Sequence, residues 1–110
     1  MSQPIPLEID FHKDMIEIYH RAKEECDYNA TRFLQMVSNE GGLKTATKLL
    51  ATAEPSDGFT ELWRNHRLDL TMENLVLKPK YRSLFTEQEI EIARERLDSY
   101  GFSNRENQTQ

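Results

Sequence analysis

The chain has 110 residues, one cysteine and a formal net charge of −5, with 37% hydrophobic and 30% charged residues. Such a chain fits one domain with a modest core that needs no metal or disulfide, and this composition excludes global disorder. A single cysteine excludes an internal disulfide, and no apolar run approaches the roughly 20 residues of a membrane span. Residues 1–6 lack the basic and apolar regions of a signal peptide, so we expect a cytoplasmic protein.

The N-terminal part of the chain predicts a long helix over about residues 10–25. Phe11, Met15 and Ile18 follow the spacing of one helical face, and Asp10 is the expected N-cap. Residues 1–6 contain two prolines and predict a flexible arm.

Two shorter helices should follow, separated by a glycine pair. Asn29 is the expected cap of a helix ending near Asn39, and Gly41-Gly42 should stop it. The next helix is predicted over about residues 43–53. Its inward side chains should be Leu43, Ala46, Leu49 and Leu50, and its outward ones Lys44, Thr45 and Lys48.

Local capping signals divide the remaining chain into short helices and one long one. A turn at 54–58 precedes a predicted helix over about 59–66, Thr71 should cap a helix over about 72–77, and Pro79 should begin the next. Thr86-Glu87-Gln88-Glu89 is a capping box that predicts a helix over about 86–100, closed by Gly101 with an apolar contact from Phe102.

These elements predict an all-α fold: a compact single domain of six or seven helices, two of them long (about 10–25 and 86–100) and several short. The domain should cover residues 7–102, with a disordered tail at 103–110, which has no apolar residue. The side chains expected to be largely buried are Phe11, Met15, Ile18, Leu34, Leu49, Trp63, Leu75, Leu84, Ile90 and Leu97.

Distinctive strings spread over residues 12–102 include Gly41-Gly42-Leu43, Gly58-Phe59-Thr60, Arg67-Leu68-Asp69-Leu70-Thr71, Leu75-Val76-Leu77 and Leu84-Phe85-Thr86. In these strings the chain resembles a family of small, uncharacterised bacterial proteins and fused domains. The resemblance implies a bacterial, cytoplasmic helical module. It implies no activity and no catalytic residue.

The histidines and the cysteine do not form a pattern of metal ligands or nucleophiles. Glu17 and His20 have the Glu-x-x-His spacing of di-iron bundles, but the second copy that such a site needs is missing. Cys26 lies on the apolar stripe at the negative end of the first helix, which favours a buried structural thiol. We therefore expect no metal, no cofactor and no catalytic residue. An enzyme site assembled from ordinary carboxylates and histidines stays open.

The segment around Gly41-Gly42 has the outline of a helix-turn-helix. Residues 29–53 carry three basic residues against one acidic residue, in a chain that is otherwise acidic or balanced. Lys44, Thr45 and Lys48 suit contacts with phosphate, and the start of their helix offers free backbone donors to an anion. Glu40 in the turn and the small number of lysines weigh against DNA binding.

A second basic group lies in the short-helix region. Arg64, Arg67, Lys80 and Arg82, with Lys78, would suit an acidic partner such as the first helix of another copy of the chain. Because no motif reaches the threshold for an enzyme, the preferred function is a non-catalytic protein-interaction module, an accessory or regulatory bacterial protein. The alternative is a helix-turn-helix-like DNA-binding protein that uses the helix after Gly41-Gly42.

Overall fold

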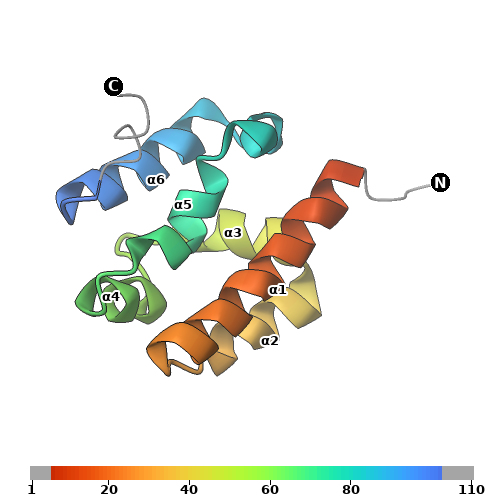
Figure 1. Cartoon of the computed structure of the whole chain (residues 1–110). Helices are drawn as coiled ribbons and strands as arrows, with labels where there is room; N and C mark the ends of the chain where they lie inside the picture. Colours follow the sequence, from red (N-terminus) through yellow and green to blue (C-terminus); the bar gives the residue numbers. More distant parts are fainter. Residues whose placement is uncertain (1–5, 103–110) are drawn as a thin grey trace.

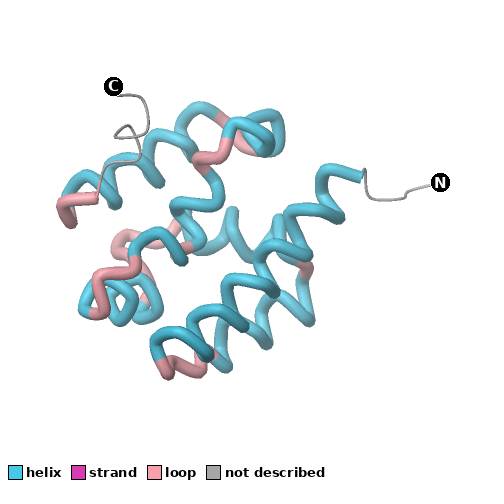
Figure 2. Tube along the Cα trace, in the orientation of Figure 1, coloured by secondary structure: helices cyan, strands magenta, loops and turns pink. Residues whose placement is uncertain are grey.

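The helices, arranged as in Figure 1, pack around three clusters of buried apolar side chains. The computed structural model describes residues 6–102. In that part of the chain every regular element is helical and no strand occurs, which confirms the all-α prediction (Figure 2). The elements are α1 (Pro6–Cys26), α2 (Thr31–Glu40), α3 (Gly42–Leu50), α4 (Asp57–Arg64), η1 (Leu68–Leu70), α5 (Met72–Val76), η2 (Pro79–Leu84) and α6 (Glu87–Ser99), where η denotes a 3₁₀ helix. As predicted, the first and last helices are the longest, with 21 and 13 residues.

Helix α1 starts earlier than its sequence signal indicated. It begins at Pro6, in the first turn, where the missing N–H of proline costs nothing. The predicted N-cap role of Asp10 is therefore wrong, and Asp10 instead lies 3.6 Å from Lys80 on η2. The predicted flexible arm lies outside the described residues except for Pro6, and the predicted disordered tail lies outside them entirely.

The connection from α1 to α2 corrects a second predicted cap. Asp27 adopts a positive φ of 56° and ends α1. Asn29 does not cap α2; its Oδ1 accepts a hydrogen bond of 2.6 Å from the Tyr19 hydroxyl, and α2 begins without a side-chain cap. The Asn29 oxygen that could have accepted a backbone N–H at the start of α2 therefore accepts the Tyr19 hydroxyl instead.

The turn between α2 and α3 depends on two glycines for different reasons. Gly41 has φ 93° and ψ 156°, a conformation that side-chain-bearing residues rarely adopt. Gly42 has an ordinary φ, but a Cβ there would lie 2.7 Å from the Cα of His12. The second glycine therefore allows α3 to cross α1 at close range.

Capping signals located the later helices more accurately. Ser56 caps α4 and Thr71 caps α5, each accepting a backbone N–H, and the predicted capping box of Thr86 and Glu89 is present in full. At the end of α6, Gly101 has φ 83°, and the N–H of Phe102 donates to the Leu97 carbonyl, which completes a Schellman motif. These hydrogen bonds form within a few residues, so the sequence alone predicts them.

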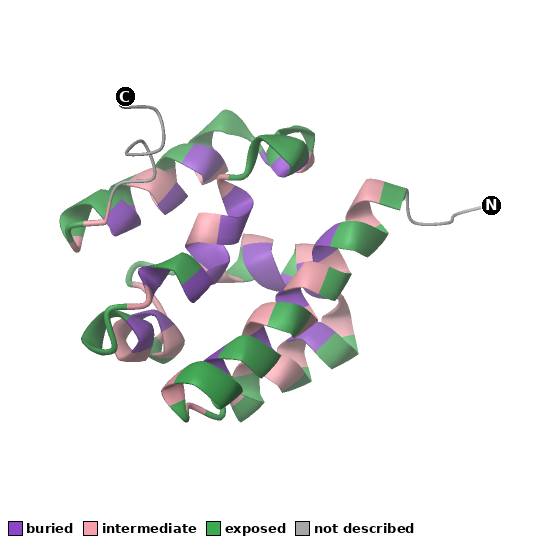
Figure 3. Ribbon diagram, viewed as in Figure 1, coloured by how far each residue is buried: buried purple, intermediate pink, exposed green. Residues whose placement is uncertain are grey.

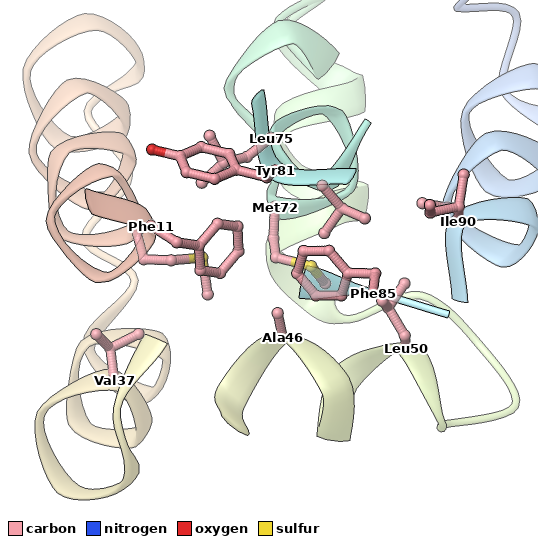
Figure 4. Close-up of a cluster of buried hydrophobic side chains, with 12 residues drawn as sticks. Phe11, Val37, Ala46, Leu50, Met72, Leu75, Tyr81, Phe85 and Ile90 are labelled. Carbon is pink, nitrogen blue, oxygen red and sulfur yellow. The ribbon is translucent and has the colours of Figure 1, made fainter. Parts of the chain in front are cut away.

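The largest core cluster joins α1, α2, α3, α5, η2 and α6 (Figures 3 and 4). Phe11 lies at its centre, with its ring edge-on to Tyr81 at 5.1 Å and to Phe85 at 5.3 Å between centroids. Two smaller clusters pack α4 and η1 against the end of α1 and against α6.

Half of the side chains that were predicted to be buried are buried in the structure. Phe11, Met15, Leu75, Ile90 and Leu97 are buried. Ile18, Leu49 and Leu84 are only partly buried against the core, and Leu34 is also only partly buried. The prediction is wrong for Trp63, which is 43% exposed.

Candidate interaction surface

Three of the four basic residues predicted to contact a partner form ion pairs within the chain. Arg67 lies 2.8 Å from Glu25 of α1 and 3.0 Å from Asp69. Arg64 lies 3.8 Å from Glu61, and Lys80 pairs with α1 as described above. Hydrogen bonds from Arg21 and Arg67 lower the pKa of the Glu25 carboxyl. Two carboxylates of α1, those of Asp10 and Glu25, thus have basic partners in the same molecule.

Arg82 differs from the other three. It is exposed, and it has no ion pair among residues 6–102, as is also true of Lys78. These two side chains on and beside η2 remain available to an acidic group outside the described fold.

The predicted anion-binding residues of α3 do not share one exposed face. Lys44 is exposed, but Thr45 is fully buried, and the prediction that it faces outward is wrong. Lys48 is held 2.9 Å from Glu40 at the end of α2. Of the three side chains, Lys44 is thus the one that is exposed and has no ion pair among residues 6–102.

A side chain of α1 accepts one of the backbone N–H groups at the N-terminus of α3. The Gly42 N–H donates to Nδ1 of His12 at 2.9 Å, so this imidazole nitrogen occupies a position that an anion would otherwise take. His12 is a half-buried contact between two helices. One of the backbone N–H groups predicted to be free at the start of α3 therefore already has an acceptor.

The remaining candidate ligands are dispersed. His20 and His66 are exposed, and Cys26 is partly buried beside Ala22, Leu62 and Leu70 rather than fully enclosed. Within residues 6–102, no group of three or more His, Cys, Asp or Glu side chains is close enough to hold a metal ion.

A buried ion pair that sequence reasoning missed joins three helices. Nη1 of Arg96 on α6 lies 3.0 Å from Oε2 of Glu73 on α5, and it also donates to the carbonyl of Leu49 at the end of α3. Nη2 donates to the Thr52 carbonyl at 2.7 Å. Burial raises the pKa of the Glu73 carboxyl, while hydrogen bonds from its own backbone and from Arg96 oppose that rise. A signal existed, since Arg96 lies between Ala93 and Leu97 on the apolar stripe of α6.

Above this ion pair lies an open groove, which we call the α6 groove. It is formed by the end of α3, the loop of residues 51–55 and the outward face of α6 from Thr86 to Tyr100. Leu50, Ala53 and Ile92 supply apolar lining, and Glu89 and Glu95 supply carboxylates. Arg96 forms part of the groove floor.

One end of the α6 groove meets an aromatic patch, defined here as Trp63 and Tyr100. The two rings are edge-on, with centroids 5.3 Å apart, and Tyr100 in turn contacts the buried Phe59 at 5.0 Å. Trp63 and Ile9 are the large apolar side chains that stay exposed in the described part of the chain. The patch is thus anchored in the core at one side and open to solvent at the other.

Fold and surface together describe a small all-α domain with an aromatic patch beside a groove. Comparisons with protein-family models, with curated proteins and with solved structures gave no match. The resemblance noted in the sequence therefore stays an expectation. Among the helices of residues 6–102, none combines the length and the apolar character needed to cross a membrane.

Proposed function

We propose that this chain is a non-catalytic helical interaction module that binds a protein partner through the aromatic patch. The observation that carries the proposal is the 43% exposure of Trp63 in a chain that buries its other large aromatic side chains wholly or in part. Tryptophan and tyrosine dominate the binding energy of protein interfaces, because they bury a large area and lose little conformational entropy.

The patch is organised before a partner arrives. Edge-on contact between Trp63 and Tyr100 restrains the indole ring, and Phe59 restrains Tyr100 from below. A restrained side chain loses less entropy on binding than a free one, so more of the buried area contributes to affinity.

The titratable groups with shifted pKa values support a non-catalytic role. Burial and a hydrogen bond to Asp14 raise the pKa of Tyr81, which is fully buried in the core. Glu73 is enclosed by its ion pair, and Glu25 and Arg67 belong to an exposed ion-pair network. Burial or a hydrogen bond within the fold accounts for the shift of each of these four groups.

We further propose that the module is an accessory or regulatory protein of the bacterial cytoplasm, in keeping with the resemblance in its sequence. Its partner is then a larger protein or a second copy of the chain. The DNA-binding alternative retains Lys44, which is exposed and has no ion pair among residues 6–102, and Lys48, which is exposed but paired with Glu40.

Affinity capture from the native cell tests the proposal. The wild-type chain is compared with Trp63→Ala and with the control Ile9→Ala, which removes the other large exposed apolar side chain, on α1. We expect a partner that the wild type and the control retain and that Trp63→Ala loses, with unchanged circular dichroism in all three. A partner retained equally by Trp63→Ala would overturn the role of the patch.

A further inference from the structure

The α6 groove offers a surface of defined length beside the aromatic patch. Its lining side chains on and directly after α6 run from Gln88 to Tyr100 and recur on each turn of the helix, so they form one stripe along it. At 1.5 Å per residue this stripe is about 18 Å long. An extended peptide of about five or six residues covers that distance.

The groove is preformed by the buried ion pair. Arg96 holds the carbonyls of Leu49 and Thr52, and Glu73 holds Arg96. The loop of residues 51–55 forms one wall of the groove. It is therefore held by hydrogen bonds to Arg96 in the floor. A preformed groove binds a segment without first having to order its own wall.

The exposed charges at the groove are negative. Arg96 is the one cation in the lining, and it is buried and neutralised by Glu73. Glu95 is exposed and has no ion pair among the described residues, and Glu54 is exposed on the adjoining loop. Glu89 is partly exposed, with one oxygen accepting the N–H of Thr86. An approaching segment therefore meets two carboxylates of the lining and a third on the adjoining loop, beside the apolar side chains of Leu50, Ala53 and Ile92.

We propose that the α6 groove binds an extended, basic segment of a partner protein in which lysine or arginine alternates with apolar residues. Successive side chains of an extended segment point to opposite sides, so apolar residues face Ile92 and Ala53 while cationic residues reach the carboxylates of the rim. The aromatic patch covers the end of the segment nearest Tyr100. This inference rests on the proposed function, because it names the partner chemistry for the same surface.

The probe is a dye-labelled synthetic peptide of about six residues that alternates lysine with leucine, and its fluorescence anisotropy measures binding. Two comparison peptides replace lysine by glutamate or leucine by serine. We expect saturable binding of the lysine–leucine peptide alone. Trp63 is the only tryptophan of the chain, so its emission should change on binding and so locate the peptide beside the patch.

The matched variants are Glu95→Lys in the groove and Glu17→Lys on the exposed face of α1, which change the net charge equally. We expect Glu95→Lys to weaken binding about fivefold or more, since it replaces an attraction by a repulsion, and Glu17→Lys to have little effect. Equal weakening by both variants, or equal binding of the lysine–serine peptide, would mean general charge attraction and would overturn the proposal.

Two further outcomes separate this inference from the proposed function. If a captured partner depends on Trp63 but tolerates Glu95→Lys, the basic segment is wrong and the aromatic patch still stands. If sedimentation shows that the wild type self-associates and that Glu95→Lys abolishes it, the occupant is a second copy of the chain, and the commitment to a partner segment is overturned.

Discussion

Arg96 of α6 and Glu73 of α5 form an ion pair in which neither side chain is more than 8% exposed. Burial of two charges is costly, and the pair is tolerated because Arg96 also satisfies two backbone carbonyls at the end of α3. The ion pair therefore joins the C-terminal helix to the middle of the chain.

Replacement of Arg96 by methionine should strongly destabilise the fold. Glu73 and the two carbonyls would remain buried without their donor, and the loss of one partner of a buried pair costs about 3–5 kcal/mol. Urea denaturation measures the loss. The control is Arg94→Met on the same helix, whose ion pair with Glu91 is exposed and whose loss should cost less than about 1 kcal/mol. Similar losses for both variants would contradict the importance of burial.

The cost of Arg96→Met should decrease in acid. Arg96 opposes the rise that burial imposes on the pKa of Glu73, so its removal raises that pKa further. A carboxyl with a raised pKa in the folded state stabilises the fold fully below its unfolded pKa and loses that contribution as the pH rises through the folded pKa. Denaturation at neutral pH and near the ordinary carboxyl value of 4.5 should therefore show a smaller difference from wild type at the lower pH. If the stability difference between Arg96→Met and wild type instead increases at the lower pH, removal of Arg96 does not raise the pKa of Glu73.

Gly42→Ala should destabilise the contact between α1 and α3 by about 1–3 kcal/mol, because its Cβ would meet the backbone of His12. The control is Gly58→Ala in α4, where the nearest atom would be the Tyr28 hydroxyl at 3.6 Å. Alanine is the better helix former, so this change should be neutral or stabilising. Thermal melting compares the two variants, and a stable Gly42→Ala protein would show that the helices can move apart.

The loss of stability should be larger for Leu97→Ala, in the core, than for Trp63→Ala, at the surface. Leu97 is 1% exposed, so its truncation should cost about 2–5 kcal/mol. Trp63 is half exposed and loses mainly its edge contact with Tyr100, so its truncation should cost less than about 2 kcal/mol. Urea denaturation of both variants decides this order. The reverse order would mean that Trp63 belongs to the core, as its spacing in the sequence had indicated.

Duplex DNA of mixed sequence should bind only weakly, with a Kd of about 10⁻⁴ M or higher at physiological salt. Lys48 is paired with Glu40, Thr45 is buried, and the chain carries a net charge of −5. Titrations at two salt concentrations with wild type, Lys44→Ala and Lys48→Ala test this expectation, and selection from random oligonucleotides searches for a rare specific site. Submicromolar binding weakened by both substitutions would favour the DNA-binding alternative.

The sequence by itself determined the elements whose signals act over a few residues. The capping box of Thr86 and Glu89, the cap at Thr71 and the glycine stop at Gly101 all satisfy backbone groups within one turn. Helical periodicity likewise predicted α1 and α6 and the burial of Phe11 and Leu97. Caps and helical periodicity depend little on what packs against a helix, so the all-α fold followed from them.

Only the tertiary structure decided which polar and aromatic side chains meet. Asn29 and Asp10 are good local caps, but Asn29 accepts a hydrogen bond from Tyr19 of the preceding helix, and Asp10 pairs with Lys80 of η2. Trp63 has the spacing of a core residue, yet it lies at the surface.

The same holds for the residues that build the proposed surface. Thr45 is buried on α3, which packs against α1, and Arg96 is buried where it contacts Glu73 and the end of α3. A helix wheel gives the angle between side chains but not the direction from which a neighbouring helix approaches. That direction is set by packing between residues far apart in the sequence, and it places the aromatic patch beside the α6 groove.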